Sequence, residues 1–414
     1  MNRQLKKYFQ HRAVTVPWKL EGASGSVFEA AIIIPALAEA ESLPQTLLSL
    51  ASNPVNFLRR TLVVTIVNNR VGCSAGQLQN NQQTLAWLNS QPFPQLNLAW
   101  VDAGSPGREI PAKEGVGLAR KIGFDLALTR LDWSQRPLLI SLDADTLVDK
   151  NYLPALFHHF QLSRCGAAVL PFRHQSATEP RQETAIRYYE LYLRSYLFGL
   201  QQAGSPYAYH TIGSAFACTA AAYVAAGGMN RRRAAEDFYF LQQLAKTTGV
   251  EILSGTLVQP SPRFSARVPF GTGKAVQAQV EDQQRPFQFS SVGAFSVLQR
   301  WLKLIEEPLS AAELQSRAAE LSPVLGAFLG ELKFVDVWQK LQVTYSTRQG
   351  RHSAFHRWFD GLRTRQLLSR LDIGKSPPPA EAVAEILAWG GYPGIERVPE
   401  QLALLESLQQ AVDN

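Results

Sequence analysis

The chain has 414 residues, of which 46% are hydrophobic and 18% charged, and it carries a formal net charge of +7. This length is sufficient for two or three domains with sizeable cores, and the composition is that of a globular enzyme, not of a disordered or fibrous protein. A mild positive charge without a dense run of Lys and Arg favours an anionic ligand or an acidic membrane surface and does not indicate nucleic-acid binding.

The cysteines and the N-terminal segment indicate in which cellular compartment the protein is found. Cys73, Cys165 and Cys218 lack CxxC spacing, which excludes a disulfide framework or a cysteine zinc site and indicates a reducing environment. Residues 1–25 are basic and lack the apolar segment of a signal peptide, so we expect a frayed basic segment there. No run of about 18 apolar residues predicts a transmembrane helix. We predict a cytoplasmic protein, with peripheral contact at the inner face of the membrane as the alternative.

Strands and helices alternate over the first 170 residues. Apolar runs predict strands, and segments with apolar residues at helical spacing predict helices between them. Ser42 is a candidate N-cap, and Pro44 falls in a first helical turn. Continuous apolar strands joined by crossover helices predict an α/β fold with a mostly parallel sheet flanked by helices. The expected strands are 27–35, 61–67, 96–101, 138–142 and 166–172, and the expected helices are 41–50, 77–88, 113–131 (amphipathic) and 151–162.

The pattern changes after Pro171. A long Tyr- and Leu-rich helix is expected, then a small apolar segment, a second helix, a strand or strand pair, and a loop rich in Pro, Gly and Ser. Residues 292–414 are expected to be helical, with a stiff break at 376–382 and with their tryptophans in a core. The long helix is expected at 181–202, the small apolar segment at 212–229, the second helix at 234–249, the strand or strand pair at 250–262 and the loop at 261–291.

Asp143 and Asp145 directly follow the buried strand 138–142. Isolated carboxylates are costly to remove from water unless they are paired or bind a metal, and ligands of open α/β sheets bind at the carboxyl ends of the strands. Residues two apart on an extended segment point to the same side, so both side chains can hold one hard cation together with phosphate oxygens. The pair predicts a Mg²⁺ or Mn²⁺ site, with capping of the following helix as the alternative.

Glu236 and Asp237 open a predicted helix just after an arginine cluster at 231–233. A carboxylate beside arginines stays ionised and can accept a proton from a hydroxyl, although acids at a helix start also complement its dipole. The small residues Gly213 and Ser214 upstream allow a ligand close to the backbone.

Three further segments are weaker candidates. The loop 262–276 places Arg263, Arg267 and Lys274 around two glycines, which suits either a lid over a phosphate or a plain surface loop. The GVGLAR segment (115–120) has Arg120 where a dinucleotide fingerprint needs its third glycine, so a Rossmann cofactor site is not expected. His210 is a candidate third metal ligand, with a core histidine as the favoured alternative.

The order of these motifs resembles the family 2 glycosyltransferases with the GT-A fold. The resemblance covers about residues 27–250 and rests on IIIPALAEAESLPQTLLSL, TLVVTIVNN, KEGVGLARKIGFDLAL, LLISLDADT, and IGSAFACTAAAYVAAGGM followed by AAEDFYFL. It implies a GT-A domain over 26–291, with a nucleotide-binding half at about 26–172 and an acceptor half at about 173–291. A basic segment (1–25) precedes this domain and a helical region (292–414) follows it.

The resemblance also implies roles for single residues. Asp145 matches the metal ligand of the family's DxD motif, Asp143 matches its ribose or metal contact, and Asp237 matches the catalytic base. The Asn68–Asn69 pair stands where the family usually has a base-reading aspartate, a departure that leaves the nucleotide open. The other donor-side matches are Pro35, Glu39, Lys113 and Arg120, with Arg267 and Lys274 expected at the diphosphate and Gly213, Ser214 and Glu236 on the acceptor side.

The function implied is metal-dependent, inverting transfer of a sugar from a nucleotide-sugar donor to an acceptor hydroxyl, in polysaccharide, glycolipid or cell-envelope synthesis. The acceptor is a glycan, a lipid-linked or a small molecule. Two alternatives stay open. One is a nucleotidyltransferase, although its glycine- and lysine-containing loop is absent from PALAEAES (35–42), and the other is a non-catalytic binding module with a decayed site.

Overall fold

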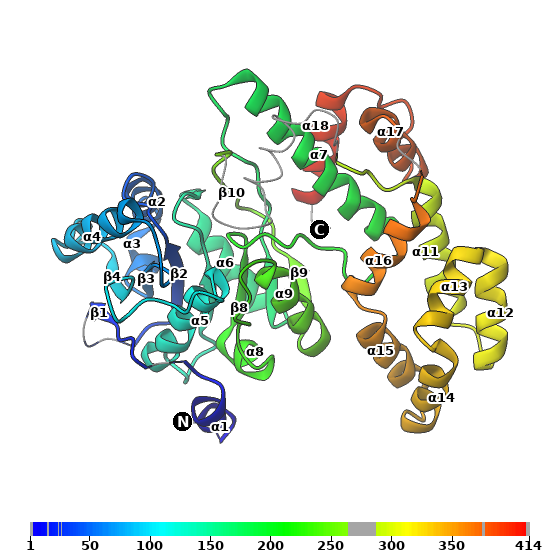
Figure 1. Ribbon diagram of the computed structural model, residues 1–414, viewed down its shortest axis with the longest axis horizontal. Helices are drawn as coiled ribbons and strands as arrows, with labels where there is room; N and C mark the ends of the chain where they lie inside the picture. Colours follow the sequence, from blue (N-terminus) through cyan, green and yellow to red (C-terminus); the bar gives the residue numbers. More distant parts are fainter. Residues whose placement is uncertain are drawn as a thin grey trace. The chain divides into compact units, whose positions relative to one another are not determined.

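The structure is a computed structural model that describes residues 3–14, 16–23, 25, 27–263, 287–374 and 377–410 (Figure 1). The chain forms two compact units. The first comprises Met1–Ile186, Thr211–Glu281 and Gln409–Asn414, and the second comprises Arg187–His210 and Asp282–Leu408. In the described part of the chain no helix is both long and apolar enough to cross a membrane.

The first unit is built on an eight-stranded mixed sheet in the order β1-β4-β3-β2-β5-β8-β7-β9. The run β4-β3-β2-β5 is parallel, whereas β8 is antiparallel to both of its neighbours. The carboxyl ends of four strands therefore meet at one edge of the sheet. The strands are β1 (Glu21–Gly22), β2 (Ala30–Ala36), β3 (Thr61–Asn68), β4 (Asn97–Ala103), β5 (Leu138–Ser141), β7 (Ala167–Val169), β8 (Phe216–Thr219) and β9 (Val250–Ile252), with β6 (Leu147–Val148) and β10 (Val258–Gln259) forming a separate antiparallel pair.

Helices cover this sheet, as the α/β pattern requires (Figure 1). The central strands β2 and β3 are buried along their whole length, because helices pack on them and hide their Ile, Val and Leu side chains from water. The α/β prediction of a mostly parallel sheet flanked by helices, with a helical C-terminal region, is confirmed. The helices are α1 (Arg3–His11), α2 (Leu43–Ala51), α3 (Val55–Leu58), α4 (Ala75–Asn89), α5 (Val116–Ala127) with a 3₁₀ turn at Leu128–Arg130, α6 (Tyr152–Leu162), α8 (Ala220–Ala225) and α9 (Glu236–Thr247), while α7 (Pro180–Gln202) runs through both units.

Helix α5 differs from the amphipathic helix expected at this position. Every residue from Gly117 to Ala127 is buried, including the charged Arg120, Lys121 and Asp125. The polar side of the helix is covered because α1 docks there: the Tyr8 hydroxyl donates to Asp125 Oδ1 at 2.6 Å and Val14 N–H donates to Asp125 Oδ2 at 2.7 Å. Residues 3–11 are thus a docked helix and not the frayed segment that we expected.

Two local features go beyond what the sequence indicates. The segment 212–229, which we expected only to be small and apolar, contains strand β8, which pairs with β5 and β7. Ser42 occupies the N-cap position of α2, but its side chain makes no capping hydrogen bond. The hydroxyl instead accepts a hydrogen bond from Arg263 Nη1 at 3.3 Å.

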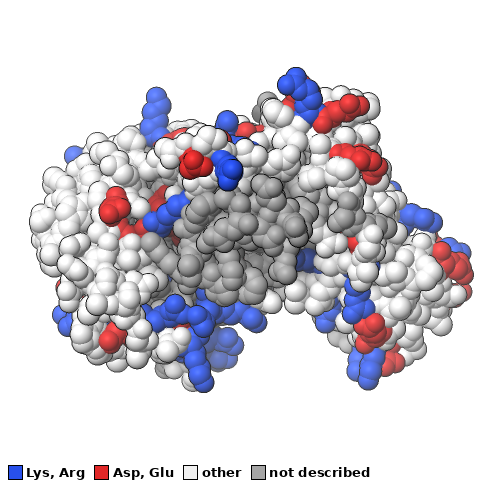
Figure 2. Space-filling model, turned by 45° about the horizontal axis from the view of Figure 1, so that its top comes forward, with Lys and Arg blue, Asp and Glu red and all other residues white. Residues whose placement is uncertain are grey.

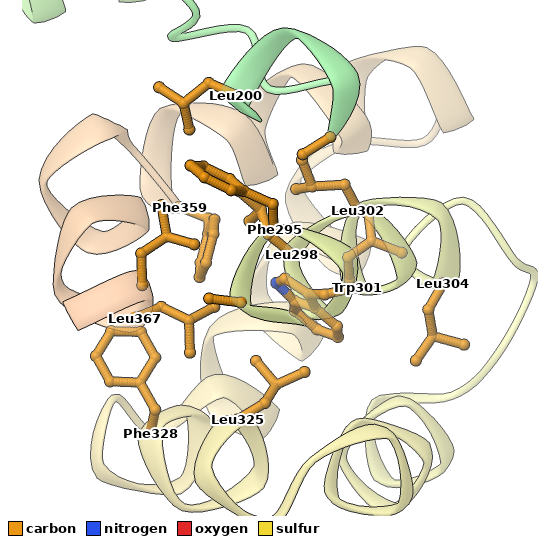
Figure 3. Close-up of a cluster of buried hydrophobic side chains, with 14 of the residues drawn as sticks. Leu200, Phe295, Leu298, Trp301, Leu302, Leu304, Leu325, Phe328, Phe359 and Leu367 are labelled. Atoms are coloured by element: carbon orange, nitrogen blue, oxygen red, sulfur yellow. The ribbon is translucent and has the colours of Figure 1, made fainter. Parts of the chain in front are cut away.

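The second unit is helical in its described residues. Trp301, completely buried, lies at the centre of its core, where it contacts the rings of Phe334, Phe355 and Phe359 edge-on (Figure 3). Trp338 is also buried, and Trp358 and Trp389 pack against the same cluster, so the prediction of core tryptophans is confirmed. The helices after α7 are α11 (Val292–Leu304), α12 (Ala311–Leu321), α13 (Pro323–Glu331), α14 (Phe334–Thr344), α15 (Arg348–Trp358), α16 (Gly361–Leu371), α17 (Pro379–Trp389) and α18 (Val398–Gln410).

Candidate functional site

Polar side chains gather where the parallel strands of the first unit end. Glu39 follows β2, Asn68 ends β3, Asp102 lies near the end of β4, and the segment from Asp143 to Asp145 follows β5. The side chains of Asp143 and Asp145 are 37% and 21% exposed, so both carboxylates reach solvent from a largely buried edge. This arrangement places a polar, accessible strip at the position where α/β sheets bind ligands.

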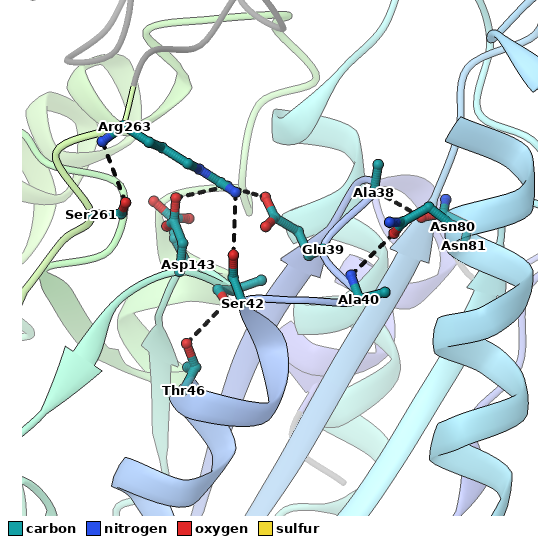
Figure 4. A network of polar contacts seen from close by, with 12 residues as sticks. Ala38, Glu39, Ala40, Ser42, Thr46, Asn80, Asn81, Asp143, Ser261 and Arg263 are labelled. Carbon is teal, nitrogen blue, oxygen red and sulfur yellow. Dashed lines mark hydrogen bonds and ion pairs between the residues drawn. The ribbon is translucent and has the colours of Figure 1, made fainter. Parts of the chain in front are cut away.

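The loop after β2 is held in place by two asparagines of α4 (Figure 4). Ala38 N–H donates to Asn81 Oδ1 at 2.8 Å, and Ala40 N–H donates to Asn80 Oδ1 at 3.0 Å. Asn81 also donates to the carbonyl of Asn68 at 2.9 Å, so one buried amide joins the ends of β2 and β3. Glu39 is thereby fixed at the edge of the sheet.

Arg263 links two of the strand ends (Figure 4). Its guanidinium pairs with Glu39 Oε1 and lies 2.7 Å from Asp145 Oδ2. These two carboxylates raise the pKa of Arg263 although its burial acts in the opposite direction. Arg263 therefore stays charged and supplies a cation at the side of the strip that carries Asp145.

Arg120 is the second cation, and it is only 2% exposed. Its three nitrogens each have a partner: Nε donates to Ser141 Oγ at 2.9 Å, Nη1 to Glu236 Oε1 at 3.2 Å, and Nη2 to Asp143 Oδ1. Ser141 in turn donates to the Gly213 carbonyl at 2.6 Å. A buried guanidinium thus connects α5, the end of β5, the segment before β8 and the start of α9.

The first turn of α9 holds two carboxyl groups with raised pKa values. Burial raises the pKa of Glu236, while Arg120 acts to lower it. Burial and the neighbouring Glu236 carboxyl raise the pKa of Asp237 to about 7, and Arg120 opposes them. Asp237 is half-buried and accepts a hydrogen bond from Phe238 N–H at 2.7 Å. A carboxyl group that titrates near neutral pH and reaches solvent is suited to general base catalysis.

A close approach of two backbones brings these acids to Arg120. A Cβ atom at Gly117 of α5 would lie 2.8 Å from the Asn230 carbonyl oxygen and 3.0 Å from Glu236 Cβ. Any side chain at position 117 would therefore push the segment 230–236 away from α5. The glycine of the GVGLAR segment serves this contact, which explains the glycine spacing without a dinucleotide site.

The structure also places the other residues that were predicted for the site. Pro35 is buried within β2, and Lys113 is exposed before α5, where it forms no ion pair with a described residue. Asn69 is buried, and its main chain bonds to Ala103 and Ile110. His210 is buried at the end of a second-unit segment and stays a prediction as a ligand. Arg267 and Lys274 lie outside the described residues.

Some buried polar atoms near the strip lack hydrogen-bond partners among the residues that the structure describes. They are Asn68 Oδ1, Asn69 Oδ1 and Ser214 Oγ. An unpaired buried polar atom costs about 1–3 kcal/mol of folding free energy, so such atoms are uncommon in native proteins. Buried atoms without a partner also occur far from the strip, for example Trp301 Nε1 and Trp338 Nε1, so these three do not by themselves indicate a ligand.

The charge balance of the site leaves room for a cation. Among the described residues, five carboxyl groups, from Glu39, Asp143, Asp145, Glu236 and Asp237, surround two guanidinium groups, those of Arg120 and Arg263. No cluster of three or more His, Cys, Asp or Glu side chains suited to a metal occurs within the described ranges. Two accessible carboxylates nevertheless fit Mg²⁺ or Mn²⁺, because such ions take only one or two protein carboxylates when water and phosphate complete the shell. The ion would compete with Arg263 for Asp145.

Sequence inspection missed several residues of this site. Ser141 looked like part of a buried strand, and Asn80 and Asn81 looked like members of a polar helix. Asn81 had a usable signal, because an amide facing the sheet at a core position of a helix must satisfy its hydrogen bonds inside the protein. Asp102 was also missed. Its carboxylate stabilises the following loop by accepting hydrogen bonds from the N–H groups of Gly104 and Ser105.

Comparison with known proteins gives limited guidance. No family model and no curated protein matches the sequence. The S. aureus TarS fragment 1–349 in complex with UDP-GlcNAc is similar at 13% identity over 92% of each chain, with a TM-score of 0.39. The mannosyltransferase PcManGT from Pyrobaculum calidifontis, in complex with GDP-Man and Mn²⁺, is similar at 13% identity over 98% of this chain and 92% of that one, with a TM-score of 0.37. Likeness at these values does not discriminate between activities.

Proposed function

We propose that this chain is a glycosyltransferase that moves a sugar from a nucleotide-sugar donor to an acceptor hydroxyl, with inversion at the anomeric carbon. The proposal is supported by Asp237 and by the link between its neighbour and the end of β5. This carboxyl group has a pKa of about 7, and its neighbour Glu236 is joined through Arg120 to Asp143 at the end of β5. A candidate base and a candidate donor site therefore belong to one buried network.

The donor side of the reaction would lie along the strand ends. Asn68, at the end of β3, stands where the donor nucleoside is expected, and Arg263 offers a guanidinium to a diphosphate. Asp143 and Asp145 would hold Mg²⁺ or Mn²⁺, which when bound neutralises charge on the leaving diphosphate. The predicted contacts of Arg267 and Lys274 with the diphosphate belong to the same proposal.

The chemical step needs a base on the acceptor side. Asp237 in its ionised form takes the proton of the acceptor hydroxyl as the hydroxyl oxygen attacks the anomeric carbon. The bond from that carbon to the diphosphate oxygen breaks, and its electron pair leaves with the nucleoside diphosphate. Attack from the side opposite the leaving group inverts the anomeric centre. Glu236, held by Arg120, keeps Asp237 in place and keeps its pKa raised.

A donor screen tests this proposal. Purified full-length protein is incubated with UDP-, GDP- and dTDP-sugars, simple hydroxyl acceptors and Mn²⁺, and release of nucleoside diphosphate is measured. We expect release from one donor class and none from the Asp237→Asn variant. Pyrophosphate release from a nucleoside triphosphate and sugar phosphate would instead indicate a nucleotidyltransferase. Failure to bind any donor would indicate a non-catalytic module and contradict the proposal.

A further inference from the structure

The first unit also contains a polar cavity that none of the strand-end residues lines. It is an open cleft of about 550 Å³ between the end of α1, the turn after α8 and one face of α9. Four cationic side chains line it, those of Arg12, Lys121, Arg231 and Arg232, and no carboxylate from the described part of the chain does. Lys and Arg side chains gather along the lower edge of this unit in the space-filling view (Figure 2). We propose that this cleft binds the phosphate group of an organic phosphate, at a site separate from the donor site.

Two of the four cations already have partners. Lys121 lies 3.0 Å from Asp125 Oδ2, and Arg231 lies 2.5 Å from Glu114 Oε1. These carboxylates lie outside the cleft lining and compensate the two cations locally. Arg12 and Arg232 have no ion pair with any residue that the structure describes. The uncompensated charge of the cleft therefore resides on two guanidinium groups, which are well suited to phosphate because each presents paired N–H donors.

The backbone is shaped to bring these cations together. Gly227 and Gly228 have φ angles of +86° and +80°, a region that favours glycine. A Cβ atom at Gly227 would lie 2.9 Å from Arg12 Nη1, and one at Gly228 would lie 1.9 Å from the Tyr8 hydroxyl oxygen and 3.0 Å from Lys121 Nζ. The two glycines thus let Arg12 and the hydrogen-bonded Tyr8–Lys121 pair lie against one turn of the chain. Of the cations brought together here, Arg12 is the one without an ion pair to a described residue, and its charge favours an anion in the cleft.

Arg232 is held by an aromatic ring as well. Its guanidinium carbon lies 3.8 Å from the centroid of the Tyr239 ring on α9. A stacked guanidinium keeps its N–H edges free for an anion while its face is covered. The cleft volume exceeds that of a phosphate group and falls in the usual range for organic ligands. The geometry therefore points to a phosphate ester or diphosphate with an attached organic group.

This ligand can come from solution or from the headgroup of an anionic lipid. Helix α1 ends at the cleft and exposes Lys6 and Lys7, so a phospholipid surface offers the same chemistry as a soluble phosphate. Two arms of one experiment separate the sources. Calorimetry uses inorganic pyrophosphate at low salt, and cosedimentation uses phosphatidylglycerol vesicles with phosphatidylcholine vesicles as the neutral control.

The variant Arg12→Gln/Arg232→Gln tests the assignment on the full chain. Both arginines are exposed, so the variant is expected to fold, and Arg59→Gln, also exposed, controls for the loss of a surface charge. Loss of paired contacts to phosphate predicts at least about tenfold weaker binding in the double variant and unchanged binding in the control. Gln243→Glu, which adds a carboxylate to the lining, is expected to weaken binding similarly.

Arg263→Gln separates this cleft from the donor site, because that variant should keep cleft binding. Pyrophosphate binding that the double variant loses supports a soluble ligand, and vesicle pelleting that it loses supports a lipid headgroup. Absence of both kinds of binding, or equal binding by wild type and the double variant, overturns the proposal. Neither result depends on whether the protein transfers sugars.

Discussion

Replacing Arg120 with Gln is the sharpest test of the buried network. The change removes the guanidinium that pairs with Glu236 at 3.2 Å and with Asp143, while Arg120 and Glu236 are only 2% and 6% exposed. At an effective dielectric constant of about 20, one pair at this distance is worth about 5 kcal/mol, and breaking one partner of a buried pair usually costs about 3–5 kcal/mol. We expect the variant to lose about 3–5 kcal/mol of unfolding free energy at pH 8.

The loss should shrink as the pH falls. Without Arg120, Glu236 escapes the cost of a buried charge by taking up a proton, so the variant recovers part of its stability at pH 5.5. Urea unfolding at both pH values measures this difference. Arg108→Gln is the matched control, since Arg108 also lies 3.2 Å from a carboxylate, that of Asp102, but is 46% exposed. We expect the control to lose less than about 1 kcal/mol. Equal losses in the two variants, or a loss in Arg120→Gln that does not vary with pH, would refute the reasoning.

Three further predictions concern the candidate site. The rate constant kcat/KM for transfer should rise with pH through a midpoint of about 7, because Asp237 must lose its proton to act as a base; a flat profile from pH 5.5 to 8.5 would reject Asp237. Asp237→Asn should keep donor affinity in calorimetry while turnover falls by at least about 10²-fold, as expected for a group that acts in the transition state; undiminished turnover would exclude it as the base. Gly117→Val should destabilise the protein by about 1–3 kcal/mol in urea unfolding, because its Cβ would meet the Asn230 carbonyl; a variant as stable as wild type would show that the segment 230–236 is not held by this contact.

The central sheet could be predicted because its strands are continuous apolar runs. Strands β2, β3 and β5 are buried on both faces, so their Ile, Val and Leu residues mark them directly in the sequence. Strand β8 could not be predicted in this way, since FACT is short and is stabilised by pairing with β5 and β7. Helix α1 was missed because its docking depends on a buried Asp125 more than 110 residues away.

The sequence singles out candidate site residues where residue type and spacing are unusual. Asp143, Asp145 and the Glu236–Asp237 pair stand out as acids at the end of a strand and the start of a helix. Arg120 and Arg263 were also singled out, the first on the donor side and the second in a candidate lid loop, but their pairing with Glu236, Asp143, Glu39 and Asp145 was not predicted. Their roles depend on distances across more than 100 residues of chain, which spacing in the sequence does not encode.

Donor binding to wild type and to Asp145→Asn, with and without Mn²⁺, is the most direct test of the proposed donor site. Isothermal titration with the UDP-, GDP- and dTDP-sugar panel should show one donor class that binds wild type more tightly when Mn²⁺ is present. Asp145→Asn should lose that Mn²⁺-dependent gain. Donor binding by the variant that equals wild type in Mn²⁺, or no binding of any donor to wild type, would contradict a donor site at the carboxyl end of β5.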